Sequence, residues 1–190
     1  MRREQDHLRE ATSWEHGALP HRRPSPIRPR RTIANGNGEE FAISSVIKKL
    51  YNKDCYKDLS EELRYFLYRY EEHLAQKAGQ KINEGMWNRI WEVDPSKSIE
   101  HIFPQSRGSD SPTTNGLYVH RLGNLVMLPP GVNSKLRDLL PNQKADTYAK
   151  QGLLQAIEVS KLIAKRKWNR EAAQKRERRL IRWATQEWDS

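Results

Sequence analysis

The sequence contains a single cysteine, Cys55, among 190 residues. One thiol cannot form a disulfide within the chain, and it cannot build a zinc site that needs several cysteines. This scarcity favours a reducing, intracellular environment. We therefore expect a cytoplasmic protein.

Long apolar runs are also lacking. No stretch approaches the roughly 20 residues that cross a bilayer, and the N-terminus has no hydrophobic signal segment. We therefore expect no membrane partner. Hydrophobic residues make up 36% of the chain, which is below the usual range for a compact globule. A core is still expected, because the apolar residues are clustered rather than evenly spread.

Positive charge, by contrast, is abundant. Lys and Arg number 34 against 24 Asp and Glu, which gives a formal net charge of +10. Such a surplus favours a polyanionic partner, because cationic side chains displace the counterions condensed on phosphate backbones. DNA, RNA and an anionic membrane all satisfy the charge alone.

Residues 1–38 differ in composition from the rest. The stretch 20–31 combines four prolines with five arginines, which prevents regular pairing and makes the segment repel itself. We predict a disordered basic tail, either an arm that touches nucleic acid or a linker. Residues 39–190 form the predicted domain.

The pattern of this domain is mostly helical. Apolar residues at helical spacing predict helices near 41–50, 132–139 and 153–163, a longer helix from an N-cap at Asp58 to Gly79, and a basic helix over 168–188. Two short apolar runs, 99–103 and 125–128, bracket a polar loop and predict two strands. The fold class is therefore α+β, mostly α: a helical domain that carries a small ββα motif over about residues 97–140.

Two words carry the chemistry, SIEHIFPQS at 98–106 and HRLGNLVMLPPGVNSKL at 120–136. Phosphodiester hydrolysis needs a base for the attacking water and a cation for the phosphate charge. Glu100 and His101 are neighbours in a predicted strand, so their side chains point to opposite faces. We expect the carboxylate to bind a metal and the imidazole to stay free for water. Asn133 offers a second hard oxygen ligand for Mg²⁺ or Mn²⁺.

Together, these two words resemble the HNH (ββα-metal) endonuclease family. The closest resemblance is to the C-terminal nuclease domain of GmrSD-type restriction enzymes, which cut modified phage DNA. The helical word LRYFLYRYEEHL at 63–74 and the late helix with its tryptophans and arginines are similar to that family too. The resemblance covers about residues 41–188.

The resemblance implies a role for each residue. Glu100 matches the acidic metal ligand, His101 the general base, and Asn124 the asparagine whose amide ties the loop together and holds the base. Asn133 matches the last metal ligand, where many relatives have histidine. Water and DNA phosphate would complete a Mg²⁺ shell. A buried structural histidine, a surface carboxylate, a turn residue and a helix N-cap are the respective alternatives.

Further residues are candidates for nucleic-acid binding: His120, Lys135, Arg137, Lys144, Arg176 and Arg179. Solvated positive charge is the alternative for the five cations. His120 has two more, a second metal ligand or a packing residue.

These patterns predict a metal-dependent DNA endonuclease that nicks or cleaves, as the nuclease part of a phage-restriction system acting on modified DNA. The alternatives are a non-catalytic basic nucleic-acid-binding module and a degenerate nuclease used for assembly. The resemblance also implies an N-terminal sensor domain that hydrolyses nucleotide, or a partner subunit. No glycine-rich phosphate loop occurs in this sequence, so we expect a nuclease fragment or a minimal relative.

Overall fold

The computed structural model describes residues 54–107 and 118–188, together with Ile47 and Leu50. The chain divides into two units, residues 1–34 and 35–190, and every described residue lies in the second. The tail predicted at 1–38 and most of the helix predicted at 41–50 lie outside the described residues. Within the described ranges, no helix is long and apolar enough to cross a membrane.

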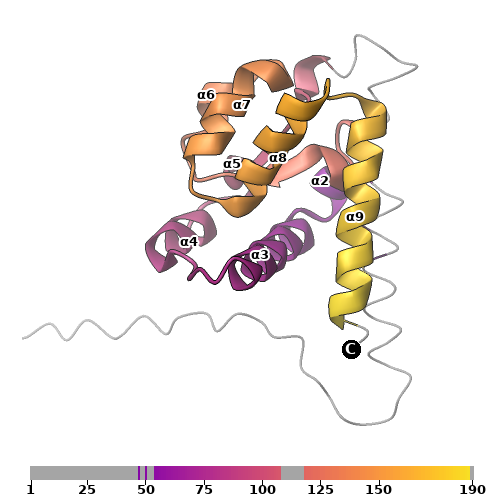
Figure 1. The fold of residues 1–190 in the computed structure, drawn as a ribbon. Coiled ribbons are helices and arrows are strands. Elements are labelled where there is room, and N and C mark those ends of the chain that lie inside the picture. Colours follow the sequence, from indigo (N-terminus) through magenta and orange to yellow (C-terminus); the bar gives the residue numbers. More distant parts are fainter. Residues whose placement is uncertain (1–46, 48–49, 51–53, 108–117, 189–190) are drawn as a thin grey trace, which may run out of the picture. The chain divides into compact units, whose positions relative to one another are not determined.

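Helices dominate the described part of the chain (Figure 1), and one two-stranded antiparallel sheet accompanies them. This arrangement confirms the α+β, mostly α class. The elements are α2 (Cys55–Asp58), α3 (Ser60–Lys77), α4 (Glu84–Trp91), α5 (Pro95–Ser98), β1 (Ile99–His101), η1 (Gln105–Arg107), η3 (Leu122–Asn124), β2 (Leu125–Met127), α6 (Asn133–Leu136), α7 (Pro141–Lys150), α8 (Leu154–Lys165) and α9 (Arg170–Trp188).

The two strands pair with Ile99 opposite Met127 and His101 opposite Leu125. Each strand has three residues, so both are shorter than predicted. The strand pairing ends at His101 because the residues beyond it form hydrogen bonds with Asn124 instead. Its backbone oxygen accepts a hydrogen bond from Ile102 N at 2.8 Å, and its side-chain oxygen accepts one from Phe103 N at 2.9 Å. A side chain thus replaces the next rung of backbone pairing.

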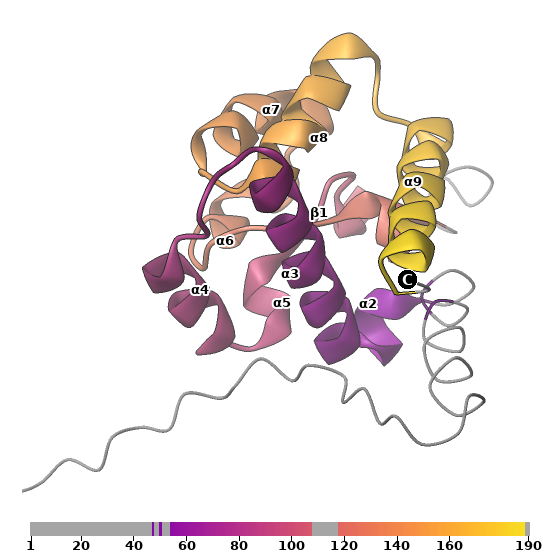
Figure 2. The ribbon, with the colours of Figure 1, turned by 60° about the horizontal axis from the view of Figure 1, so that its bottom comes forward.

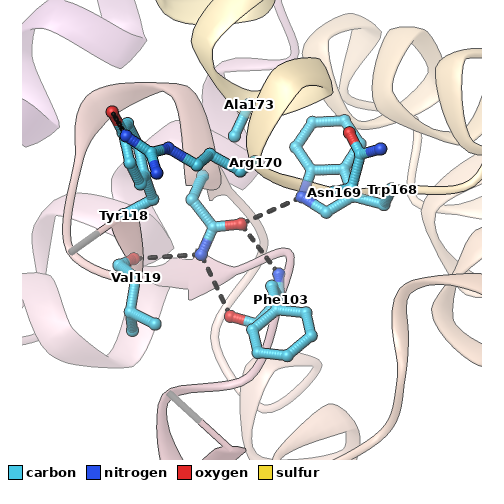
Figure 3. A pocket seen from close by; sticks show the side chains of 8 residues that line it. Phe103, Tyr118, Val119, Trp168, Asn169, Arg170 and Ala173 are labelled. Atoms are coloured by element: carbon cyan, nitrogen blue, oxygen red, sulfur yellow. Dashed lines mark hydrogen bonds between the residues drawn. The ribbon is translucent and has the colours of Figure 1, made fainter. Parts of the chain in front are cut away.

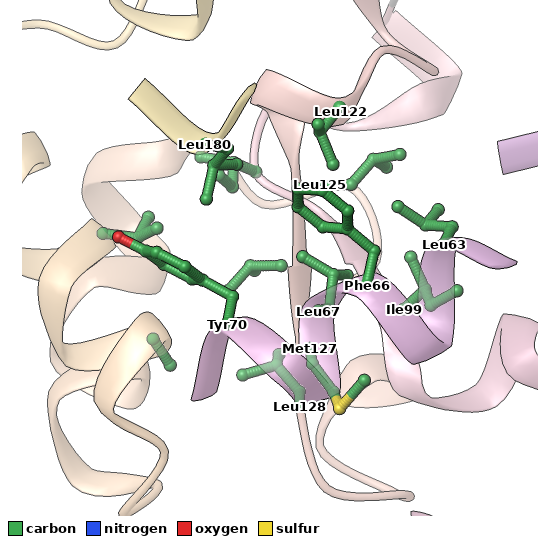
Figure 4. Close-up of a cluster of buried hydrophobic side chains, with 14 of the residues drawn as sticks. Leu63, Phe66, Leu67, Tyr70, Ile99, Leu122, Leu125, Met127, Leu128 and Leu180 are labelled. Carbon is green, nitrogen blue, oxygen red and sulfur yellow. The ribbon is translucent and has the colours of Figure 1, made fainter. Parts of the chain in front are cut away.

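One face of α3 forms the centre of the core. Leu63, Phe66, Leu67 and Tyr70 recur at helical spacing and are all buried. Figure 4 shows them against the side chains of the hairpin. Burial of an apolar side chain of this size contributes about 1.5–3 kcal/mol. The contact between α3 and the hairpin therefore helps to hold the two strands in place.

The predicted start of α3 is wrong and its predicted end is right. Asp58 belongs to α2, and the residue before α3 is Leu59, whose side chain makes no capping bond. A capping residue is worth about 1 kcal/mol, far less than the buried face, so packing sets where the helix begins. Gly79 follows the helix with φ of 65°, a conformation that glycine adopts without strain.

Four helices were not predicted: α2, α4, α5 and α7. Two of them begin with ordinary caps, since the Asn83 side chain accepts from Met86 N at 3.0 Å and that of Asp94 accepts from Ser96 N at 2.9 Å. A proline occupies the first turn of α5 and of α7. These start signals are present in the sequence. α7 packs beside α8, as Figure 2 shows.

The last helix, α9, lies directly on η3. At the contact, a methyl group built on Gly123 would overlap the carbonyl group of Ala173 and crowd Glu177. Only a residue without a side chain lets the two backbones approach this closely. The glycine of the LGN word therefore serves helix packing.

We expect Gly123→Ala to destabilise the domain by more than about 3 kcal/mol, because α9 would have to move away from η3. Gly85→Ala is the matched control: its methyl group would meet only Asn83 Oδ1, at 3.5 Å, and alanine in a helix is favoured by about 0.5–1 kcal/mol over glycine. Urea unfolding of both variants measures the difference. Equal stability of the two would contradict the close contact.

Candidate active site

His101 ends β1, and its imidazole is enclosed rather than free. The residue is 7% exposed, and its Nε2 lies 3.0 Å from Nδ1 of His120. The ring of Tyr56 meets it edge-on, with 4.4 Å between ring centres. The imidazole expected to stay free for water is thus covered on one side by α2 and His120.

Burial, with His120 and Lys144 adding to it, lowers the pKa of His101 to about 3. The imidazole is therefore neutral at neutral pH, which is the form that accepts a proton. The near-neutral pKa expected of a general base is not met in the protein alone. A DNA phosphate beside the ring would raise it, because a nearby negative charge favours the protonated form.

Glu100 points to the other side of the strand, as its place in β1 predicts. Its carboxylate oxygen Oε1 accepts hydrogen bonds from Lys144 Nζ at 2.6 Å and from Tyr148 OH at 3.3 Å. Glu100 is 3% exposed, and burial raises its pKa while Lys144 opposes this shift. The carboxylate thus belongs to a buried ion pair with α7.

Lys144 is correspondingly not a surface residue. It is 0% exposed, and besides Glu100 its ammonium bonds the backbone oxygen of His101 at 2.7 Å. This position contradicts the expected contact with DNA. The physical reason is the carboxylate next to His101: a buried charge needs a partner, and Lys144 supplies it while holding the end of β1.

Asn124 makes the densest set of contacts in the site (Figure 3). Its side-chain nitrogen donates to Phe103 O at 3.0 Å and to Val119 O at 2.9 Å. Its side-chain oxygen accepts from Phe103 N and from Trp168 Nε1, the latter at 3.1 Å. These bonds tie together chain from both sides of the segment 108–117.

A pocket opens beside this amide (Figure 3). Its lining residues are Phe103, Tyr118, Val119, Asn124, Trp168, Asn169, Arg170 and Ala173. The guanidinium of Arg170 lies over the Tyr118 ring, 4.6 Å from its centre. Asn124 lines the pocket, and both its side-chain oxygen and its side-chain nitrogen are hydrogen-bonded. This residue therefore positions its neighbours.

Asn133 begins α6 and connects it to β1. Its side-chain nitrogen donates to Ile99 O at 2.9 Å and to Ser96 O at 3.0 Å. The helix N-cap is Val132, so the alternative of a capping asparagine is not the one adopted. With the nitrogen held by two carbonyls, the amide oxygen is the atom left for a cation.

The donor chemistry fits a magnesium-type ion held by few protein ligands. In the described ranges, no group of three or more His, Cys, Asp or Glu residues is arranged to hold a metal ion. Glu100 and Asn133 are hard oxygen donors, and Lys144 and Tyr148 bond only the Oε1 atom of Glu100. Mg²⁺ commonly binds through one or two such ligands and keeps several waters.

The remaining predicted DNA contacts divide into two groups. Lys135 and Arg137 are exposed beside Asn133, and Arg179 is partly exposed but paired with Glu158 at 2.7 Å. Arg176 is 2% exposed, and its guanidinium donates to the backbone oxygens of Leu122, Gly123 and Leu125. Arg176 therefore fastens α9 to the hairpin, which contradicts the expected DNA contact.

Sequence reasoning missed what α2 contributes to the site. Asp54, Cys55 and Tyr56 all lie against His120, the first through its carboxylate, the second through its thiol and the third through its ring. No motif marks the DCYKD segment, and the contact spans more than 60 residues of chain. Only the packing of α2 beside the hairpin shows it.

Replacing Lys144 tests whether this residue is structural. We expect Lys144→Met to destabilise the domain by about 3–5 kcal/mol, because it leaves the Glu100 carboxylate buried without a partner. Adding Glu100→Gln should recover part of the loss. The exposed Lys135→Met is the control, with a change within about 0.5 kcal/mol. Denaturant unfolding measures the stability of all three variants. A Lys144→Met protein that is fully stable but binds DNA more weakly would support the expected DNA contact instead.

Comparison with known proteins was informative at the level of the family. No curated protein and no solved structure matched the chain. A family model described as "GmrSD restriction endonucleases, C-terminal domain" matches residues 42–183. That range holds β1, β2, α6 and every residue of the site described above. The chain therefore belongs to the family of C-terminal domains of GmrSD restriction endonucleases.

Proposed function

We propose that this domain is a metal-dependent endonuclease of the HNH type, which nicks or cleaves modified DNA as the nuclease part of a phage-restriction system. One observation carries the proposal. A neutral imidazole, His101, ends a short strand whose other face holds a carboxylate and whose backbone is tied to Asn133, in a chain that belongs to a restriction endonuclease family.

His101 acts as the base. Its imidazole accepts a proton from the water that attacks phosphorus, and the hydrogen bonds of Asn124 hold the backbone at Phe103, two residues beyond His101, and at Val119, next to His120. Lys144 fixes the backbone oxygen of His101 and so holds the direction of the side chain. Together, these contacts place the base without using exposed, mobile side chains.

A Mg²⁺ or Mn²⁺ ion held by Glu100 and Asn133 would stabilise the charge that develops on the phosphate and on the leaving oxygen. The contribution of the protein is to present two oxygen ligands. Asn133 does so because its nitrogen is committed to Ile99 and Ser96. The Lys144 ammonium beside Glu100 already neutralises part of that ligand's charge, which favours weak, exchangeable binding of the ion.

Contact with the DNA backbone falls to the exposed cations. On α9 these are Lys175, Arg178 and Arg182, and beside α6 they are Lys135 and Arg137. They carry no base-reading geometry, so we propose that this domain alone has little sequence specificity. Recognition of the modification belongs to a sensor domain or a partner subunit.

The decisive experiment is plasmid nicking with Mg²⁺ or Mn²⁺. We expect His101→Ala to lower the rate by at least about 100-fold, since general-base catalysis contributes 10²–10⁴-fold, and EDTA to abolish it. His73→Ala, on α3 outside the site, should keep full activity. Equal rates for wild type and His101→Ala would reject the assigned base. Salt-sensitive DNA binding without strand breaks under any divalent ion would instead support a basic binding module.

Metal binding can be measured apart from cleavage. We expect Asn133→Ala to weaken Mn²⁺ binding in calorimetry by at least about 10-fold, because it removes one of two protein ligands, whereas Ser134→Ala should leave binding unchanged. An Asn133→Ala protein with unchanged Mn²⁺ affinity would contradict the role of Asn133 as a ligand. A wild-type protein that binds no Mn²⁺ would support a degenerate nuclease.

A further inference from the structure

His120 is in direct contact with the candidate base, although it lies 19 residues away in sequence. Its Nδ1 is 3.0 Å from Nε2 of His101, and the two rings meet edge to face with 79° between their planes. The contact is part-buried. A nitrogen pair at this distance shares one proton, because a hydrogen bond needs one donor and one acceptor.

The position of that shared proton decides whether His101 can act as a base. A neutral imidazole has one N–H and one lone pair. If His101 carries its proton on Nε2 and donates it to His120, the lone pair on Nδ1 is free for water. In the opposite arrangement, His101 carries its proton on Nδ1 and its lone pair is used by His120.

We propose that His120 is a positioning residue for His101: its Nδ1 accepts the Nε2 proton of His101 and thereby keeps the Nδ1 lone pair of His101 available for the attacking water. The inference rests on the proposed function, in which His101 is the base. It adds an orienting residue from the segment just before the second strand.

Two contacts from α2 hold His120 in this position. The Tyr56 ring is stacked on it, with 5.6 Å between centres and 14° between planes. The Cys55 thiol donates to the backbone oxygen of His120 at 3.3 Å. The oxygen Oδ1 of Asp54 lies 3.9 Å from His120 Nδ1, which is too far for a hydrogen bond but close enough for the carboxylate charge to act on the histidine pair. Tyr56 also touches His101, so one aromatic ring fixes the planes of both imidazoles.

The negative charge of the Asp54 carboxylate can stabilise His101 when His101 takes up a proton. Its Oδ1 is a buried atom without a hydrogen-bond partner in the described structure. When His101 takes a proton from water, an O–H bond breaks, an N–H bond forms on Nδ1 and hydroxide attacks phosphorus. The positive charge of the resulting imidazolium lies one hydrogen bond away from His120, and the Asp54 carboxylate beside His120 stabilises it.

Two variants separate the hydrogen bond from the bulk of the ring. His120→Leu removes the acceptor, whereas His120→Asn can place an amide oxygen where Nδ1 lies. Loss of a partner that orients a functional group typically costs 10–100-fold. We therefore expect kcat for plasmid nicking to fall about 10–100-fold in His120→Leu with KM nearly unchanged, and His120→Asn to recover most of it. Thermal unfolding confirms that each variant is folded.

Nitrogen-15 NMR of the imidazoles tests the proton position without cleavage. In metal-free wild type we expect His101 to carry its proton on Nε2, and its signal is identified by its loss in His101→Gln. In His120→Leu the two tautomers should mix. A proton on His101 Nδ1 in wild type would overturn the proposal, as would a His120→Leu protein with unchanged kcat. If His101→Ala stays active while the NMR result holds, the base assignment fails and the hydrogen bond stands.

Discussion

The amide of Asn124 is the contact on which the site depends. It bonds the backbone of Phe103 in both directions, reaches Val119, and receives the indole N–H of Trp168 just before α9. One side chain thus connects the end of β1, the approach to β2 and the last helix. Because the strands are only three residues long, they cannot supply this order by backbone pairing alone.

The positive net charge of the chain includes cations that are buried and cannot contact a partner. Lys144 and Arg176 count toward the net charge, yet both are buried and bond backbone oxygens of the hairpin. Burial lowers the pKa of Arg176 to about 10, so it remains charged while it holds three carbonyls. Arginine and lysine here replace part of the backbone pairing that such short strands lack. The exposed cations that we propose for contact with phosphate lie on α9 and in the α6 region.

The sequence was sufficient for the fold class, for the hairpin and for the helices with a clear apolar face, since α3 and α8 bury side chains at helical spacing. It was also sufficient to place Glu100 and His101 on opposite faces of a strand. It did not predict α4 and α5. Their capping residues, Asn83 and Asp94, are visible in the sequence, but their apolar faces are short. Helices of one or two turns depend on packing more than on pattern.

The sequence predicted the site residues that lie within short motifs, but it did not predict the contacts between residues far apart in sequence. The neighbours EH, GN and the later asparagine could be assigned by motif, whereas the pairs Glu100–Lys144 and His101–His120 join positions 44 and 19 residues apart. Nothing in local spacing distinguishes a lysine that will neutralise a buried carboxylate from one that will meet solvent. Burial, which decides the matter, depends on how α7 packs.

The contact of α2 with the histidine pair bears on where such a nuclease module begins. The ββα motif spans β1 to α6 in sequence, but the ring that orients its imidazoles comes from Tyr56, more than 40 residues upstream of the strand. A segment cut to the motif itself, or grafted into another scaffold, would retain every residue of the sequence signature and lose the Tyr56 ring that packs on His101 and His120. The structural unit that encloses the two imidazoles is therefore the helical domain with its hairpin, and the signature is only part of it.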